Sequence, residues 1–341
     1  MNRVARWAAD RNSQGLRRWL QIGLGVLWIL DAALQYQPYM FSRDLVTGII
    51  DPASSGNPAA IASSVTGVGQ VMLHDVAAFN AAFATIQLAI GLGLLWQPAV
   101  KAALAATIGW GLAVWLLGEG LGGVLTGTAS PLTGAPGAAV LYVLLAVLIW
   151  PRPPLDGVSV HGRSPTRSVA AASPLGPRWS RLPWLLLWGS SAYFLLQAPV
   201  RAPGQLSMTI QGLAGGEPGW LASVDRSAAL AVESAGGVVS VVLAITFALV
   251  GLAVFSTAAT RTALILAGIS AAAIWVLTEN LGGILSGLGT DPNTGPLLIL
   301  LAAAYWPLPP HRHKAPEDRS TPKPAASAEV AEIVAGRPEG I

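Results

Sequence analysis

The chain repeats one stretch after 160 residues: Trp115-Leu-Leu-Gly-Glu-Gly-Leu-Gly-Gly-Val-Leu-Thr-Gly127 returns as Trp275-Val-Leu-Thr-Glu-Asn-Leu-Gly-Gly-Ile-Leu-Ser-Gly287. The two copies share the tryptophan, the glutamate, the Gly-Gly pair and the final glycine. Three shorter echoes surround them: Gly56-Asn-Pro58 with Gly216-Glu-Pro218, Pro131-Leu-Thr-Gly134 with Pro292-Asn-Thr-Gly295, and Trp150-Pro151 with Trp306-Pro307. Self-similarity at a fixed offset is typical of an internal duplication, so the sequence predicts two related halves.

The composition predicts a polytopic membrane protein. Of the 341 residues, 53% are hydrophobic and only 11% are charged, and the mean hydropathy is +0.56. Soluble domains carry roughly 25% charged residues, so these values exclude most soluble enzymes. Global disorder is excluded as well, because it requires low hydrophobicity and high net charge. The chain has no cysteine, which excludes disulfides, thiolate metal sites and cysteine-ligated clusters.

Eight apolar segments reach about the length that a helix needs to cross a bilayer. They are Trp19–Gln35, Val76–Trp96, Ala102–Gly118, Gly134–Trp150, Leu182–Val200, Gly237–Thr257, Thr262–Thr278 and Thr290–Trp306. The expected fold is therefore all-α, with eight transmembrane helices arranged as two parallel-repeat four-helix units. The expected domains are a cytoplasmic segment 1–18, a first unit 19–150, a cytoplasmic linker 151–181, a second unit 182–308 and a disordered tail 309–341.

The basic residues set the expected orientation. The N-terminal segment, the inner turns, the linker and the tail hold 17 of the 20 Lys and Arg residues, and only Arg43, Arg201 and Arg226 lie on the other side. The positive-inside rule then places both termini in the cytoplasm. The expected partner of the protein is the lipid bilayer. A nucleic-acid partner is not expected, because the net charge is only +3.

Two long outer loops, Tyr36–Asp75 and Pro199–Gly236, are expected to form short interfacial helices over the outer mouth of the bundle. The alternative is a packed cap without a ligand.

Acidic residues within or at the ends of the spans are the candidate functional groups, because ionisable side chains are costly in a bilayer and often mark function. Asp31 lies 12 residues beyond Trp19, which is about 18 Å along a helix. The candidates that could meet in one outer-leaflet pocket are Asp31, Gln35, His74, Asp75 and Glu119, and Glu279 is the second-repeat counterpart of Glu119.

Such a cluster permits proton exchange, a hydrogen bond to a quinone head group, or binding of a divalent metal, although no metal ligand is assigned. Each residue also has a structural interpretation. Asp75 could cap the second span, His74 could be a surface residue, and Glu119 could bind loose backbone N–H groups of its glycine-rich loop. Glu279 persists in the second half without counterparts of Asp31 and His74, so the first half is expected to hold the fuller site.

The two four-helix units, each with a glutamate near the outer end of its third helix, resemble a duplicated DoxX-like membrane protein over about residues 16–308. The segments Gln35–Phe41 and Thr290–Pro296, together with the excess of Arg over Lys, resemble actinobacterial polytopic membrane proteins. The DoxX resemblance implies a membrane component of quinone-linked redox chemistry, with a quinone as ligand and a redox or membrane protein as partner. Two alternatives stay open, a small-solute or ion transporter and a non-catalytic scaffold or assembly factor, and so does the question of enzymatic activity.

Overall fold

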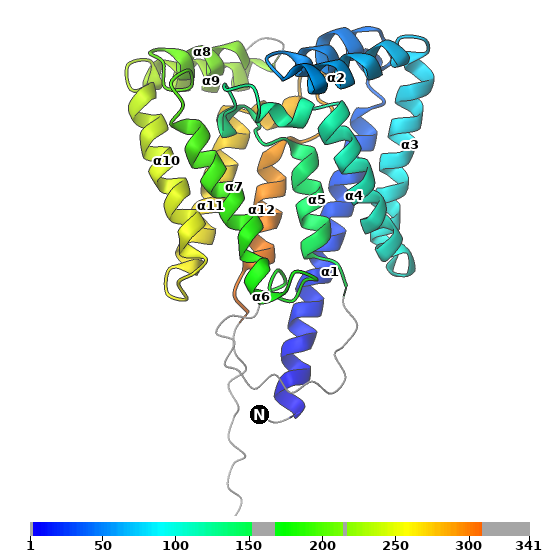
Figure 1. Cartoon of the computed structure of the whole chain (residues 1–341), viewed down its shortest axis with the longest axis vertical. Coiled ribbons are helices and arrows are strands. Elements are labelled where there is room, and N and C mark those ends of the chain that lie inside the picture. The colour runs from blue at the N-terminus through cyan, green and yellow to red at the C-terminus, as the bar shows by residue number, and fades with distance from the viewer. Residues whose placement is uncertain (1–2, 152–167, 214–216, 309–341) are drawn as a thin grey trace, which may run out of the picture.

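The computed structural model describes residues 3–151, 168–213 and 217–308. Their fold is all-helical, as predicted. Eight helices run along the long axis of the molecule (Figure 1): α1 (Arg3–Leu34), α3 (Val76–Leu95), α4 (Val100–Leu117), α5 (Ala138–Leu148), α7 (Arg181–Leu195), α10 (Gly236–Ala253), α11 (Thr260–Leu277) and α12 (Thr294–Tyr305). The short helix α6 (Gly176–Trp179) precedes α7. The predicted tail 309–341 and most of the predicted linker lie outside the described residues.

Four helical segments of the described chain are long and apolar enough to cross a membrane. They are Val76–Leu95, Gln97–Leu117, Gly236–Ala253 and Thr260–Leu277. The protein is thus a helical protein of membrane type, with four of the eight predicted spans supported by length and composition.

The remaining predicted spans differ from the expectation for local reasons. The predicted span Gly134–Trp150 starts late, because Gly134 and Gly137 adopt left-handed φ values of 92° and 104° and the helix begins only at Ala138. The resulting α5 has 11 residues and α12 has 12, or about 17 Å of helix each, against the ~30 Å of a hydrocarbon core. The helix α7 has 15 residues. The helix α1 is long enough, but Arg17, Arg18 and Asp31 interrupt its apolar stretch.

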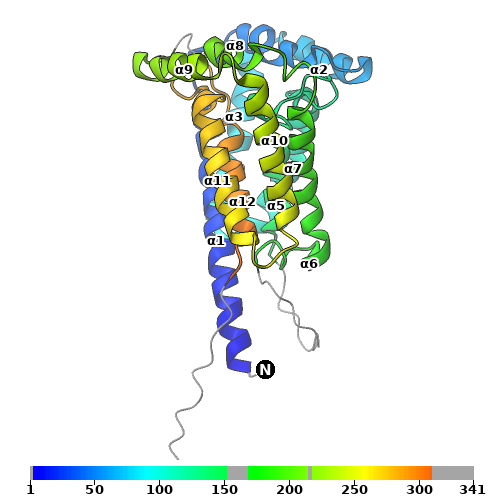
Figure 2. The ribbon, with the colours of Figure 1, turned by 90° about the vertical axis from the view of Figure 1, so that its left-hand side faces the viewer.

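The two predicted outer loops contain short helices, as expected. α2 (Ala59–Met72), α8 (Gln205–Leu213) and α9 (Gly219–Val232) lie across the end of the bundle opposite the N-terminus (Figure 2). The loop before α2 carries a helical turn, Leu45–Ile50, whose apolar side chains pack against the buried Val65 and Met72 of α2. A small hydrophobic core therefore ties this cap together.

The bundle consists of helix pairs with the same order in both halves. In the first half α1 packs on α3 and α4 on α5, and in the second half α7 packs on α10 and α11 on α12. The contacts of α12 with α1 and α5 join the halves. Glycine allows a close crossing of α1 and α3: a Cβ at Gly91 of α3 would lie 2.9 Å from the carbonyl oxygen of Gly25 in α1, as in membrane helix pairs with small residues at the contact.

Candidate functional site

A cavity of about 680 Å³ lies between α1, α3, α4 and α5, with α2 and the turn Leu45–Ile50 over it. Apolar side chains from all these elements line most of it. Its most polar lining residues are Asp31, Gln35, Gln87, Glu119, Tyr142 and Asp291, and none of its described lining residues is Lys, Arg or His. Pockets of this size, mostly apolar with a few convergent polar groups, are typical of small-molecule sites.

Asp31 and Gln35 enter the cavity from successive turns of α1. Both side chains are buried, with exposures of 2% and 6%. The backbone carbonyl of Gln35 accepts a hydrogen bond of 2.8 Å from Nδ2 of the buried Asn80, which fixes α1 against α3. Asp31 Oδ1 and Gln35 Oε1 have no hydrogen-bond partner among the described residues. Two predicted site residues thus present free acceptor atoms to the cavity.

Glu119 lies directly beyond the end of α4, and its carboxylate caps the following bundle helix. Its Oε1 accepts a hydrogen bond of 3.0 Å from the backbone N–H of Ala139 in α5. The other oxygen, Oε2, is buried and has no partner in the described chain. Gly137 makes room for this oxygen, because a Cβ at Gly137 would collide with it. Burial, reinforced by the charge of Asp291, raises the pKa of Glu119 to about 8.

Asp291 was not predicted as a site residue. It comes from the loop before α12, in the other half of the chain, and lines the same cavity. Its carboxylate accepts hydrogen bonds from the backbone N–H of Asn293 at 2.7 Å and from Thr290 Oγ1 at 2.9 Å. No spacing rule connects Asp291 with Asp31, 260 positions away, so the sequence offered only the general signal of an acid between predicted spans.

His74 and Asp75 do not line the cavity, although the sequence grouped them with Asp31. Both are exposed at the start of α3. Asp75 is the N-cap of this helix and accepts a hydrogen bond of 3.0 Å from the backbone N–H of Ala78. His74 Nδ1 lies 3.0 Å from the carbonyl oxygen of Gln70. Asp75 thus caps the first turn of α3, His74 contacts the last turn of α2, and neither lines the cavity, so their structural interpretation fits the observed contacts.

The deeper part of the cavity holds polar groups that the sequence did not single out. Trp28 Nε1, Gln87 Oε1 and Trp110 Nε1 are buried without a hydrogen-bond partner among the described residues. The Tyr142 hydroxyl lies near the Asp31 carboxyl, but their geometry falls short of a hydrogen bond. Tryptophan, tyrosine and glutamine are ordinary residues of membrane helices, so only the three-dimensional structure gathers these atoms around one space.

The second half has a much smaller space at the corresponding place. A void of about 10 Å³ is lined by residues that include Trp188, Ser191, Phe247 and Leu298. The first three stand 160 positions after Trp28, Asp31 and Gln87. The Phe247 ring packs on the Trp188 ring with 5.0 Å between centroids and fills the space.

Glu279 occupies the position of Glu119 in this half, but both of its oxygens are used. Oε1 accepts a hydrogen bond from Thr294 Oγ1, and Oε2 accepts one of 3.1 Å from the backbone N–H of Gly295. Burial nevertheless raises its pKa to about 7. Glu119 therefore caps α5 and Glu279 caps α12. Of the two, only Glu119 keeps an oxygen without a hydrogen-bond partner among the described residues.

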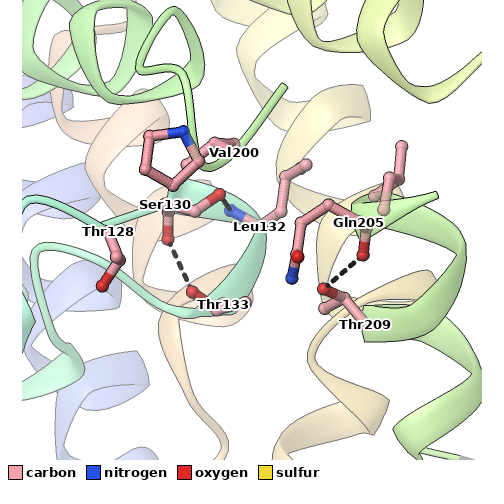
Figure 3. A pocket seen from close by; sticks show the side chains of 9 residues that line it. Thr128, Ser130, Leu132, Thr133, Val200, Gln205 and Thr209 are labelled. Atoms are coloured by element: carbon pink, nitrogen blue, oxygen red, sulfur yellow. Dashed lines mark hydrogen bonds between the residues drawn. The ribbon is translucent and has the colours of Figure 1, made fainter. Parts of the chain in front are cut away.

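A second pocket of about 150 Å³ lies between the loop of Thr128 to Thr133 and α8 (Figure 3). Its hydroxyl groups make local bonds: Thr133 Oγ1 donates to the Ser130 carbonyl, and Thr209 Oγ1 donates to the Gln205 carbonyl. None of its lining side chains is charged. The chemistry that could serve a ligand is therefore concentrated in the larger cavity.

Comparison of the chain with protein families, with characterised proteins and with solved structures finds no match.

Proposed function

We propose that the chain is a DoxX-like protein of the bacterial inner membrane, with eight spans in two parallel four-helix units and both termini in the cytoplasm. The equivalent helix pairs of the two halves support this arrangement. So does a matched tryptophan bond: Trp115 Nε1 donates to the Pro136 carbonyl, and Trp275 Nε1 donates to the Pro292 carbonyl. The short helices α5 and α12 would complete their spans with the residues directly before them, 134–137 and 291–293, which are at least partly buried, and irregular backbone buried in protein is tolerated at membrane depth.

The proposed function is to bind the head group of a lipid-soluble quinone in the cavity between α1, α3, α4 and α5. One observation carries this proposal: buried polar atoms without partners from Asp31, Gln35, Gln87, Glu119 and Trp110 converge on one mostly apolar space. An unsatisfied buried polar atom costs roughly 1–3 kcal/mol. A ligand that combines an apolar body with hydrogen-bonding oxygens would remove this cost at several atoms together.

The protonation of the carboxyl groups suits a quinone. With a pKa of about 8, Glu119 is mostly protonated at pH 7 and can donate a hydrogen bond from its free oxygen. A quinone carbonyl oxygen accepts such a bond. Reduction of a quinone to a quinol consumes two electrons and two protons. Protonated carboxyl groups can supply the protons, and a redox protein partner would supply the electrons.

The apolar lining suits the isoprenoid tail of such a ligand. Phe79 and Phe83 of α3 and Val71 of α2 line the cavity and are at least partly exposed on the surface of the molecule. These side chains can contact the apolar tail of a ligand whose head group lies at Asp31. The lack of any basic residue among the described lining argues against an anionic ligand.

Transport of a polar solute is less well supported. Below Gln87, α3 continues as Leu-Ala-Ile-Gly-Leu-Gly-Leu-Leu to Leu95, so this wall of the cavity has no polar side chain that could extend a path toward the N-terminal end of the bundle.

Equilibrium binding of a short-chain quinone to the purified protein, followed by quenching of tryptophan fluorescence, tests the proposal. Trp28 and Trp110 line the cavity, so we expect saturable quenching in the wild type. Asp31→Asn, and Glu119→Met, which removes the hydrogen-bonding atoms at similar size, should each weaken binding at least tenfold, which corresponds to about 1.4 kcal/mol. Glu279→Met is the matched control, because Glu279 does not line the cavity. Equal quinone affinity in all four proteins would contradict the proposal.

A further inference from the structure

The outer end of the cavity is covered by a packed apolar core. Leu45 and Ile50, from the turn before α2, line the cavity and are buried, with exposures of 4% and 8%. They belong to the hydrophobic core that joins this turn to α2, in which Val46 and Val65 are fully buried. A ligand that came straight from the outer solution would have to separate this core.

One flank of α2 borders the cavity and is also exposed. Ser63, Gly67 and Val71 follow one another at intervals of four residues, so they lie on one side of the helix. All three line the cavity, and all three are exposed. A Cβ at Gly67 would meet nothing within 4 Å. The cavity therefore reaches the surface of the protein along this flank.

Aromatic rings of α3 and α4, the helices over which α2 lies (Figure 1), border the same opening. The rings of Phe79 and Phe83 are 6.4 Å apart between centroids, and those of Phe83 and Trp110 are 5.3 Å apart. All three side chains line the cavity and are partly exposed. We call the opening between these rings and the α2 flank the mouth of the cavity.

The matching flank of α9 indicates the surroundings on this side of the cap. Val224 stands 160 positions after Ser64, which lines the cavity. Val224 and Trp220, one helical turn apart, are 39% and 61% exposed. The exposed Arg226 and Glu233 lie on the opposite side of this helix. Helices at a membrane interface place tryptophan and apolar residues toward lipid and charged residues toward water, so this flank fits a lipid-facing position.

We propose that a quinone enters the cavity sideways from the outer leaflet through the mouth, and that its isoprenoid tail lies against Gly67 and Val71 and continues into the lipid. The ligand class is then a quinone with a long apolar chain, delivered by the membrane, and a water-soluble quinone is a poorer ligand. This inference rests on the proposed function and on the proposed orientation.

Two quinones with the same ring, one with several isoprene units and one without a tail, test the proposal on the purified full-length protein. Quenching of tryptophan fluorescence gives the Kd of each. We expect the wild type to bind the tailed quinone more tightly. Gly67→Phe places a ring in the mouth and should raise the Kd of the tailed quinone at least tenfold more than that of the tailless one. Ser227→Phe is the matched control, because the exposed Ser227 holds the same position in α9 and does not line the cavity.

Val71→Phe, one turn further along the same flank, should change the two affinities in the same direction, and it provides the test if Gly67→Phe does not fold. Changes of equal size for both quinones, or Kd values in both variants equal to those of the wild type, would overturn the mouth and leave the head-group site standing. Failure of both quinones to bind the wild type would overturn the head-group site and the mouth together.

Discussion

At the scale of single residues, Glu119 and Glu279 differ in how many of their carboxylate oxygens accept hydrogen bonds from the protein. Gln at position 119 can still accept the Ala139 N–H bond with its oxygen and place its amide at the unused position of Oε2. At position 279 an amide group would face the donors Thr294 or Gly295, because both carboxylate oxygens accept bonds there.

We therefore predict that Glu119→Gln folds to nearly the wild-type level, whereas Glu279→Gln loses about 1–2 kcal/mol of stability. Thermal unfolding in detergent, with the level of folded protein after extraction, measures both. Equal losses in the two variants would show that Glu119 is only a helix cap.

The stability of the wild type should fall as the pH rises. The pKa of Glu119 is raised from 4.5 to about 8 in the folded state, so the folded protein binds more protons than the unfolded chain between these values, and its stability decreases over that interval. We predict a Tm that decreases from pH 5 to pH 8, with this decrease reduced in Glu119→Gln. An identical pH profile in the variant would contradict the assignment of a protonated Glu119.

Three residues of this site could be predicted from the sequence. Asp31 and Glu119 are candidates because acids in or near apolar spans are rare. Gln35 is a candidate because it lies one helical turn after Asp31. The sequence places His74 and Asp75 at the outer start of the second predicted span, but α3 uses Asp75 as its own N-cap and leaves His74 exposed. Asp291 required the packing of α12 against α1 and α5, which no pattern within one half contains.

At the scale of helices, the close crossing of α1 and α3 depends on a glycine where the two helices touch. A Cβ at Gly91 would lie 2.6 Å from Ile29 Cγ1 and 2.9 Å from the Gly25 carbonyl oxygen, whereas a Cβ at Gly109 meets nothing within 4 Å. We predict that Gly91→Ala lowers stability by about 1–3 kcal/mol through overpacking. Gly109→Ala, in α4, should be neutral or stabilising by up to about 1 kcal/mol.

Unfolding of both variants in the same detergent compares them directly. A Gly91→Ala protein as stable as Gly109→Ala would show that α1 and α3 do not cross as closely as described. The existence and order of these helices followed from hydropathy, but the late starts of α5 and α12 did not, because Gly134 and Gly137 delay α5 through backbone conformations that hydropathy does not report.

At the scale of the whole molecule, the proposed orientation places the cap helices outside the cell. The chain has no cysteine, so single cysteines can report each side. We predict that a cysteine replacing the exposed Ser55 beside the cap reacts with an impermeant thiol reagent in intact cells. One replacing the exposed Ala258, in the turn between α10 and α11, should react only after the cells are opened. The reverse pattern would overturn the orientation.

The two halves of the chain differ in the space between their helices. The first half surrounds an open cavity, whereas Phe247 fills the equivalent space in the second half. A single ligand per chain is the consequence.

Photo-crosslinking with an azido-quinone in native membranes, followed by mapping of the labelled peptides, shows whether the cavity of the first half is where a quinone binds. We predict label on the α3 and α4 segments that carry Phe83 and Trp110, at no more than one per chain, and strongly reduced labelling in Asp31→Asn. Label on the segments that carry Trp188 and Phe247, or labelling unchanged in Asp31→Asn, would contradict it.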